Sequence, residues 1–473
     1  MNARRKAVWF YILGDAIASA ASWALFFIYR KRFVEAQVYG YALPVELTTH
    51  FKLSLIAIPL FWITLYAFTG AYWDVYRKSR LQEVRRAFMI TFLGTLFLFF
   101  TLLLDDVVKD YNAFRYTFTA LFLFQFVSIS VVRTLVLSWI KHQLEKGGTG
   151  FRTILVGSDV KAEKVYEAIQ QSPVALGFQF VGYVSVKDAP PHLLKDRMPS
   201  LGQVEDLPDL IHRHRIEDVI VAIDSEDYHR LYHVLAAVEA ENVSIHIFPG
   251  ELDILLRRIP LTTIYGPPLV EIPPHVMPPL ERNIKRLFDI VFSLTVVVVG
   301  APIYLLIALA VKLSSPGPIL FCQERIGRFG HPFIIYKFRT MYADAEKDGP
   351  RLSEGRYDPR ITPVGRFLRK TRLDELPQFV NVLKGDMSVV GPRPERSVFI
   401  QKIIERAPEY RLVLKVRPGI TGLAQVKRGY TFTLDDMVDR LRWDLIYIQN
   451  MSLWLDIKII LLTIITVIRR QGN

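Results

Sequence analysis

The sequence predicts a membrane protein of mixed α and α/β class, with a four-helix transmembrane bundle, a Rossmann-like parallel α/β domain and a mostly helical C-terminal domain that carries a re-entrant membrane helix. Three observations support this prediction. Four apolar segments in the first 146 residues each approach the ~20 residues that cross a bilayer. Short strand-like and helix-like segments then alternate over residues 147–266. A further apolar run, from Leu287 to Leu313, is interrupted by Gly300-Ala301-Pro302.

Composition limits the kind of protein and the kind of partner. Of the 473 residues 51% are hydrophobic, and the formal net charge is +13. A positive charge of this size suits anionic partners such as acidic lipid headgroups or nucleotide phosphates. A single cysteine, Cys322, excludes an internal disulfide, and no zinc-ligand spacing is present. The first apolar stretch is too long for a cleavable signal peptide and lacks a small-residue cleavage site.

Aromatic and basic residues border the four apolar segments, as is typical of membrane interfaces. The segments are expected at residues 8–29, 53–72, 87–104 and 116–140. Basic residues precede the first, separate the second from the third and follow the fourth, whereas the loop between the third and the fourth is acidic. This distribution predicts a bundle, residues 1–146, with both ends in the cytoplasm; the basic first loop is the exception.

Two charged residues, Asp15 and Arg133, lie inside these segments. A charge inside a membrane often marks a functional site. We favour the simpler interpretation, in which each side chain lies near the interface or faces a neighbouring helix.

The α/β domain, residues 147–266, follows a glycine-rich linker. Strands are expected at residues 153–157, 178–184, 218–223 and 243–248, and helices at residues 161–170, 207–214 and 228–241. This alternation predicts a parallel sheet of Rossmann type. The dinucleotide fingerprint is incomplete, because Ser158, Asp159 and Val160 follow Gly157 where further glycines are required. We therefore predict a regulatory or dimerising domain in preference to an NAD site.

A proline-rich connector, residues 267–284, leads into the last domain, residues 285–473. Basic residues lie on both flanks of its apolar run, which indicates that both ends stay on the cytoplasmic side. Pro302 interrupts the hydrogen-bond ladder of a helix and permits a sharp bend. We predict a re-entrant helix over residues 287–313 that enters the inner leaflet and returns. The alternative is a single kinked transmembrane helix.

Two adjacent carboxylates, Asp374 and Glu375, open an apolar-periodic segment that ends near Gly385. Pro377 is tolerated only in the first turn of a helix. The sequence therefore predicts Asp374 as the N-cap of a helix, with Glu375 in its first turn. Unpaired N–H groups and the helix dipole favour anions there, so the position suits a phosphate or an ionised carboxylate.

Cationic residues gather around this carboxylate pair along the sequence. Thr362-Pro363 predicts the start of a short basic helix. The turn at residues 391–395 presents an arginine, and the loop at residues 417–425 has glycines that let the backbone approach a ligand closely. Arginine and lysine side chains can neutralise phosphate groups, arginine bidentately. The candidates are Lys337, Arg339, Arg366, Arg369, Arg372 and Arg393.

Three further expectations concern the same domain. Asp358 and Arg360 are expected to form a structural ion pair. Asp344 is a candidate for binding a metal or for supporting a metal ligand. The tail, residues 452–470, is too polar at its start to span a bilayer cleanly and is predicted to be an interfacial amphipathic helix.

These motifs together resemble the bacterial sugar transferase family, the monotopic polyprenyl-phosphate phosphoglycosyl transferases. The resemblance covers residues 285–473, and the four helices with an α/β domain resemble the large subgroup, whose members load glucose or galactose 1-phosphate onto undecaprenyl phosphate. The matching motifs are Pro316-Gly317-Pro318, residues 323–327, residues 337–341, residues 374–378, residues 391–394 and residues 417–425.

The resemblance implies a ping-pong reaction between a UDP-sugar and undecaprenyl phosphate. Asp374 would attack the β-phosphorus, release UMP and hold the sugar phosphate until the lipid phosphate attacks it. Glu375 would bind Mg²⁺. The residues expected to bind substrate are Lys337, Arg339, Arg366, Arg369, Arg372, Pro392, Arg393, Arg417, Thr421 and Gln425.

The expected location is the bacterial inner membrane, with the catalytic domain on the cytoplasmic face. The expected partners are anionic lipids of the inner leaflet and a second copy of the chain, with no nucleic acid. The product would be the first membrane-bound intermediate of a surface polysaccharide, such as an O-antigen, a capsule or an exopolysaccharide.

Three other functions are considered: a membrane sensor gated by a nucleotide, a membrane-tethered nucleotide-sugar dehydratase or epimerase, and a bundle that flips lipid. The first two need a complete glycine-rich turn, and the second also needs a Tyr-x-x-x-Lys pair on a helix. The predicted sheet has neither. Nothing in the sequence tests the third function, and the sugar stays open because epimers differ by one hydroxyl.

Overall fold

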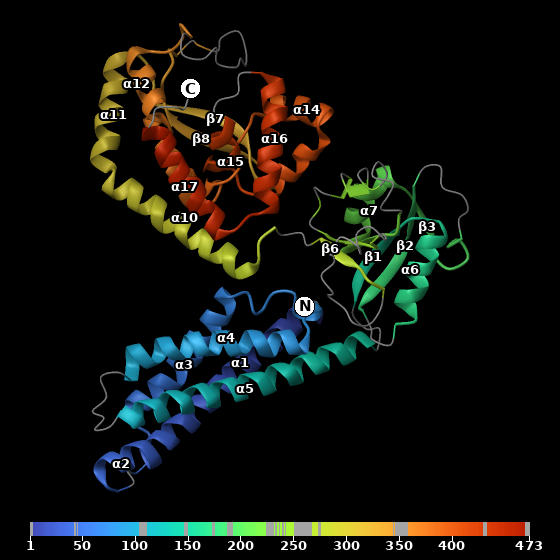
Figure 1. Ribbon diagram of the computed structural model, residues 1–473, viewed down its shortest axis with the longest axis vertical. Coiled ribbons are helices and arrows are strands. Elements are labelled where there is room, and N and C mark those ends of the chain that lie inside the picture. Colours follow the sequence, from blue (N-terminus) through green and yellow to red (C-terminus); the bar gives the residue numbers. More distant parts are fainter. Residues whose placement is uncertain are drawn as a thin grey trace. The chain divides into compact units, whose positions relative to one another are not determined.

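Figure 1 shows the computed structural model of the chain. The chain divides into two compact units, one of residues 1–151 with 172–178 and one of the remaining residues. The structure describes residues 3–41, 46–103, 111–145, 150–172, 176–186, 193–223, 243–249, 267–272, 276–343, 358–428 and 433–468, and the single residues 44, 231, 234, 235, 237, 238, 241 and 345.

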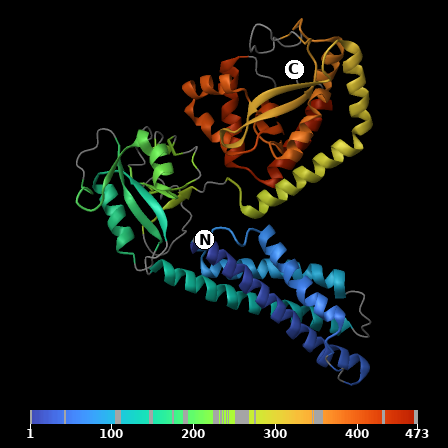
Figure 2. The same cartoon turned by 180° about the vertical axis from the view of Figure 1, so that it is seen from behind.

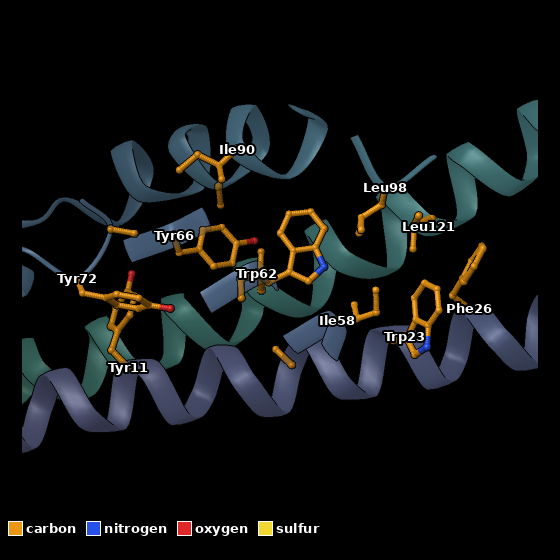
Figure 3. Close-up of a cluster of buried hydrophobic side chains, with 14 of the residues drawn as sticks. Tyr11, Trp23, Phe26, Ile58, Trp62, Tyr66, Tyr72, Ile90, Leu98 and Leu121 are labelled. Carbon is orange, nitrogen blue, oxygen red and sulfur yellow. The ribbon is translucent and has the colours of Figure 1, made fainter. Parts of the chain in front are cut away.

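The four predicted membrane segments are confirmed as helices long and apolar enough to cross a bilayer. They are α1 (Ala3–Tyr29), α3 (Thr49–Phe68), α4 (Arg80–Leu98) and α5 (Tyr111–Glu145), and the short α2 (Glu35–Tyr39) follows α1. Figure 3 shows Trp62 and Tyr66 of α3 between the other helices of the bundle. A Cβ on Gly94 of α4 would lie 2.4 Å from the ring of Trp62, so only glycine allows α4 to pack this closely.

A buried ionic cluster joins three of these helices. The guanidinium of Arg133 in α5 donates to Asp15 of α1, at 2.7 and 3.1 Å, and to Glu83 of α4 at 2.8 Å. It also lies 4.0 Å from the ring centroid of Tyr66. The Tyr72 hydroxyl donates to Asp15 at 3.0 Å. The prediction that Asp15 and Arg133 face neighbouring helices is therefore confirmed.

Replacing Arg133 by leucine is expected to destabilise the bundle by about 3–5 kcal/mol, because Asp15 would lose its buried counter-charge and Glu83 would keep only Lys78, at 3.2 Å. The measurement is thermal unfolding in detergent, followed by size-exclusion chromatography. Arg80→Ala is the matched control, since Arg80 is an exposed cation at the start of α4. Equal unfolding temperatures for the two variants would contradict a stabilising role of the cluster.

The α/β domain contains a six-stranded sheet in the order β3-β2-β1-β4-β5-β6. The predicted strands are confirmed as β1 (Phe151–Val156), β2 (Phe178–Ser185), β4 (Asp218–Val221) and β5 (Ser244–Ile247), and the predicted helices as α6 (Val160–Gln170) and α7 (Leu207–His214). β1 pairs in parallel with β4, and β4 with β5. Figures 1 and 2 show α6 beside β1 and β2 from both sides. The helix predicted at residues 228–241 lies largely outside the described residues.

The sequence prediction missed two short edge strands. β3 (Ser200–Gln203) has four residues without a buried face, so it gives no alternating signal. β6 (Val270–Ile272) pairs antiparallel with β5 and lies inside the stretch predicted as a connector. The stretch predicted as a proline-rich connector therefore contains an edge strand, and it also contains the start of the next helix at Pro279.

A Rossmann domain binds pyrophosphate at the N-terminus of the helix after its first strand, and here the side chain of Asp159 caps that N-terminus. Asp159 caps α6, and its carboxylate accepts hydrogen bonds from the backbone N–H groups of Lys161 and Ala162. In a dinucleotide-binding domain these N–H groups face the phosphates. The Lys161 ammonium donates to the carbonyl of Ile223 at the end of β4, at 3.2 Å. This geometry favours a structural domain over a dinucleotide site.

The C-terminal domain begins with a pair of helices, α10 (Pro279–Val299) and α11 (Ala301–Ser314), bent by 62° at Gly300. The bend predicted at Pro302 is confirmed. Apolar side chains on both helices are exposed, among them Leu287, Leu305 and Leu309. Figure 1 shows the pair along one side of the domain, with a β-hairpin inside the bend. The hairpin joins β7 (Leu320–Ile326) to β8 (Pro332–Phe338).

The remaining elements surround this hairpin. They are α12 (Pro363–Thr371), α13 (Gln378–Lys384), β9 (Ser388–Val390), α14 (Ser397–Arg406), β10 (Gly419–Thr421), α15 (Leu423–Arg428), α16 (Leu434–Gln449) and α17 (Leu453–Ile468). β9 and β10 form a parallel pair. The core beneath them includes Val382, Met387 and Ile403, all fully buried. Asp358 and Arg360 form the predicted ion pair, at 2.6 Å.

Buried polar contacts fix α10 to β9. The Lys285 ammonium donates to Asp456 of α17 at 2.6 Å and to the carbonyl of Val390 at 2.9 Å. The Asp289 carboxylate accepts from the hydroxyl of Ser388 at 2.8 Å and from the backbone N–H of Val389 at 3.0 Å. A charge taken out of water needs partners of this kind. The apolar helix pair is therefore anchored to the strand that leads into the 391–395 turn.

Candidate active site

Asp374 and Glu375 lie in a buried 3₁₀ turn, Leu373–Glu375, between α12 and α13. The prediction of Asp374 as an N-cap was wrong. Arg372 adopts a left-handed backbone conformation, φ 60°, and the 3₁₀ turn starts directly after it. The N-cap of α13 is Pro377, three residues after Asp374. The site therefore rests on a buried turn instead of a helix N-terminus, and the two carboxylates are only 5% and 7% exposed.

Glu375 is held by two cations. Its carboxylate lies 2.9 Å from the Lys337 ammonium of β8 and 3.4 Å from the Arg393 guanidinium. Burial raises the pKa of Glu375, but Lys337 and Arg393 outweigh burial and hold the pKa well below its usual range. Burial lowers the pKa of Lys337, and Glu375 partly offsets this change. The two charges therefore support each other in a site with little solvent.

Asp374 is the less satisfied carboxylate of the pair. Its Oδ1 atom is buried and has no hydrogen-bond partner within the part of the chain that the structure describes. Burial, and then the neighbouring Glu375, raise the pKa of Asp374 to about 6. Three cations act in the opposite direction: Lys337, Arg369 and Arg372. A poorly solvated carboxylate oxygen of this kind suits a nucleophile.

The turn that carries both acids is supported from the apolar helix pair. The Tyr304 hydroxyl of α11 donates to the carbonyl of Leu376 at 2.7 Å. The far end of α13 is capped by two guanidinium groups. Arg286 donates to the carbonyl of Val382 at 2.8 Å, and Arg417 to that of Gly385 at 2.9 Å. Tyr304 was not predicted as a site residue, because a tyrosine in an apolar run resembles an interfacial anchor.

Arg393 projects from a turn that is fixed on both sides. Backbone bonds connect it to β10, from the N–H of Gly391 to the carbonyl of Thr421 and from the N–H of Gly419 to the carbonyl of Pro392. A Cβ on Gly391 would lie 2.5 Å from the carbonyl oxygen of Arg417, so glycine is required for this packing. Pro392 is buried in the turn.

A buried ionic cluster supports the same turn at Glu395. Its carboxylate accepts from Arg440 of α16 at 2.7 Å and from Arg325 of β7 at 3.3 Å. Arg325 also donates to the carbonyl of Pro394. Arg440 was not predicted, because it lies 45 residues from Glu395 and belongs to no linear motif.

Several cations expected at the substrate have partners within the protein. Arg339 is buried and donates to the carbonyls of Ser315 at 2.6 Å and Pro316 at 2.7 Å. Its side chain supports the Pro316-Gly317-Pro318 turn, so its geometry is structural and differs from the predicted phosphate contact. Arg417, as the cap of α13, differs from its predicted role in the same way.

The remaining predicted residues lie in two places. On α12, Arg369 donates to the hydroxyl of Thr340 at 2.9 Å, and Arg366 is exposed. Near β10, the hydroxyl of Thr421 lies 2.6 Å from that of Thr463 in α17, and Gln425 donates to the carbonyl of Ile420. The structure thus brings Asp374, Glu375, Lys337 and Arg393 together, with Arg369 and Arg372 close enough to influence the charge of Asp374.

The acids fit one Mg²⁺ ion. Magnesium binds through one or two carboxylates and substrate phosphates, and it keeps several waters. Asp374 and Glu375 supply two adjacent carboxylates, one with a buried unpartnered oxygen. Among the described residues no group of three or more acidic, histidine or cysteine side chains could hold a metal. Asp344 lies outside the described residues.

Four apolar helices, a bent helix pair and a buried acid pair with cationic neighbours define a membrane protein with a site for anionic groups. Residues 280–470 match the model of the bacterial sugar transferase family, and residues 67–249 match a CoA-binding domain. The chain is 33% identical over 417 residues to the UDP-glucose:undecaprenyl-phosphate glucose-1-phosphate transferase of Escherichia coli strain K12, covering 86% of this chain and 88% of that protein. The chain belongs to the bacterial sugar transferase family.

Two further relatives show how the similarity is distributed. The undecaprenyl-phosphate galactose phosphotransferase of Salmonella typhimurium strain LT2 is 31% identical over 451 residues, which covers 91% of this chain and 89% of that protein. The UDP-N-acetylgalactosamine-undecaprenyl-phosphate N-acetylgalactosaminephosphotransferase of Aeromonas hydrophila is 44% identical over 194 residues, 41% of this chain and 46% of that protein. Relatives named for different sugars therefore resemble this chain.

Proposed function

We propose that this protein transfers a hexose 1-phosphate, glucose or galactose, from a UDP-sugar to undecaprenyl phosphate and releases UMP. The observation that carries the proposal is the buried pair of Asp374 and Glu375, held against Lys337 and Arg393. Relatives matching most of the chain are named for this transfer with glucose or galactose. The product would be the first lipid-linked intermediate of a bacterial surface polysaccharide.

In the proposed mechanism Asp374 acts as the nucleophile. A carboxylate oxygen of Asp374 forms a bond to the β-phosphorus, and the bond from that phosphorus to the bridging oxygen breaks, so that UMP leaves with the electron pair. An oxygen of undecaprenyl phosphate then attacks the same phosphorus. The bond to Asp374 breaks, which regenerates the carboxylate and yields the sugar-diphospholipid.

The other residues of the site neutralise and orient charge, which is the main requirement of phosphoryl transfer. Lys337 and Arg393 fix Glu375 and place two cations beside the reacting phosphate. Arg369 and Arg372 add positive potential at Asp374. Mg²⁺ held by Glu375 would neutralise charge on the phosphate oxygens.

We place the catalytic domain on the cytoplasmic face of the inner membrane, with α10 and α11 as a re-entrant pair. The 62° bend and basic residues on both flanks support this topology. Exposed apolar side chains of α10, α11 and α17 suit lipid contact, and anionic inner-leaflet lipids suit the net charge. The α/β domain is proposed as a regulatory or dimerising module, because Asp159 caps the helix N-terminus where a dinucleotide would bind.

The function is tested with purified protein, radiolabelled UDP-glucose or UDP-galactose, Mg²⁺ and undecaprenyl phosphate. The expected products are UMP and a lipid-extractable sugar diphosphate, formed from one donor in preference to the other. Labelled lipid that carries the sugar without the donor's phosphate, or release of UDP in place of UMP, would contradict the proposal.

The first half-reaction is expected to depend on pH through Asp374. Attack needs the ionised carboxylate, and the pKa of Asp374 is raised to about 6, so acidification through this value removes the reactive form. A bound cation lowers a neighbouring carboxyl pKa, so the midpoint is expected at or below about 6.

The measurement is the rate of sugar-phosphate incorporation into protein between about pH 5 and about pH 8 without lipid. Below the midpoint the rate is expected to fall about tenfold per pH unit, and above it to stay level. A rate that decreases from about pH 6 to about pH 8 would indicate that the protonated acid is the active form.

A further inference from the structure

A fully buried asparagine links α13, the helix after the turn that carries Glu375, to β8, the strand that carries Lys337. Asn381 is on α13, the helix that follows the Asp374–Glu375 turn, and its exposed fraction is 0%. A buried side-chain amide must find hydrogen-bond partners, because an unsatisfied one costs about 1–3 kcal/mol. Asparagine is also a poor helix former, so packing and propensity do not explain this residue.

The partners of Asn381 are backbone groups of the strand that carries Lys337. Its Oδ1 accepts from the N–H of Tyr336 at 3.1 Å, and its Nδ2 donates to the carbonyl of Ile334 at 2.7 Å. In a β-strand the backbone groups of residues i and i+2 point to the same edge. The side-chain amide therefore binds β8 as a neighbouring strand would, while β7 pairs with β8 through the register of residues 320–326.

These two bonds fix the spacing of the ion pair. Lys337 directly follows Tyr336 on β8, and Glu375 lies in the turn that leads into α13. β8 is thus linked at two places to the turn and the helix α13: by the bond from Lys337 to Glu375, 2.9 Å, and by the two bonds of Asn381. Without that contact, β8 and α13 would be joined through the ion pair, apolar packing and the exposed bond from the Lys384 ammonium to the Tyr336 hydroxyl, 2.7 Å.

We propose that Asn381 is a positioning residue: its amide docks β8 on α13 and thereby holds the Lys337 ammonium at Glu375 for the phosphate transfer. This inference rests on the proposed function and adds a residue that touches neither substrate. Asn381 also lies 3.4 Å from Asp386, with its Nδ2 as the donor, so the amide orientation is set by three acceptor and donor groups. An aspartate at this position would have an oxygen in place of Nδ2. That oxygen could not donate to the carbonyl of Ile334 and would face the carboxylate of Asp386.

The test compares Asn381→Ala and Asn381→Asp in full-length protein. Both variants are expected to incorporate sugar phosphate about 10- to 100-fold more slowly in single turnover, because a small displacement of a charged group has effects of this size. Asp keeps the shape of the side chain, loses the donor and adds a negative charge beside Asp386, so it is expected to be at least as slow as the Ala variant. Thr433→Ala is the matched control: it removes the N-cap of α16 and costs about 1 kcal/mol.

A double-mutant cycle with Lys337→Met distinguishes positioning from general stability. If Asn381 acts through Lys337, Asn381→Ala slows labelling in the natural background and has no further effect beside Lys337→Met. If labelling is too slow to measure, the same four variants are made with Asp374→Asn added. Their affinity for UDP-glucose is then measured in place of the labelling rate. Equal losses in both backgrounds, or no loss in the natural one, would overturn the proposal.

Hydrogen exchange separates this inference from the proposed function. The backbone amide of Tyr336 is expected to exchange faster in Asn381→Ala than in Thr433→Ala, whether or not the protein labels. Natural protein that fails to label from any UDP-sugar would overturn the covalent mechanism and remove the catalytic part of the inference. Unchanged exchange at Tyr336 would overturn the docking contact itself.

Discussion

Asp374→Asn is expected to abolish covalent labelling and to reduce overall turnover by at least about 10³-fold, as loss of a nucleophile does in other covalent enzymes. The amide has nearly the same shape as the carboxylate but cannot form the acyl phosphate. Because the buried Oδ1 atom of Asp374 has no hydrogen-bond partner among the described residues, the substitution breaks no hydrogen bond at that atom. The fold and the thermal stability should therefore be retained or improved.

The measurement is incorporation of radiolabelled sugar phosphate and release of UMP, each compared with the natural protein. Asp439→Asn is the matched control, because Asp439 is an exposed carboxylate on α16 in the same domain. Labelling of Asp374→Asn at the natural rate would assign the nucleophile to another residue. Turnover without labelling would point to a direct, single displacement.

Glu375→Ala is expected to slow turnover by about 10²-fold or more and to raise the Mg²⁺ concentration needed for half-maximal rate. Two effects combine: the metal loses a carboxylate, and Lys337 and Arg393 lose the charge that holds them. The second effect alone would leave a buried ammonium unpaired, which is destabilising. Glu375→Gln also removes the charge but keeps the size of the side chain and one acceptor oxygen, so it controls for the space that alanine leaves.

The measurement is initial rate against Mg²⁺ concentration at saturating UDP-sugar, with thermal unfolding recorded for each variant. A raised Mg²⁺ requirement in both variants supports Glu375 as the metal ligand. An unchanged requirement with a lower rate would assign Glu375 to the orientation of Lys337 and Arg393 and place the metal elsewhere.

The membrane part of the fold could be predicted because a bilayer imposes a length and a composition on each crossing helix. The ionic cluster of Arg133 could be anticipated for a related reason, since a charge in such a helix needs a partner. The β7–β8 hairpin could not, because the residues of β7 alternate little between buried and exposed and give no period-two signal. The edge strands β3 and β6 are too short for any periodic signal.

The acid pair could be predicted from its motif, but its geometry could not. A proline three residues after Asp374 suggested a helix start, whereas the left-handed Arg372 begins the helical run earlier. The roles of individual cations are decided by distant backbone carbonyls, as for Arg339 and Arg417, and no local pattern reveals those partners. Asn381 shows the same limitation, since its partners lie more than 40 residues away on β8.

The most direct test is mass spectrometry of the protein after incubation with UDP-glucose or UDP-galactose and Mg²⁺ in the absence of lipid. The expected result is the mass of one hexose phosphate on the peptide that contains Asp374, which disappears when undecaprenyl phosphate is added. An adduct on a different residue, or full turnover by protein that never carries an adduct, would contradict the account.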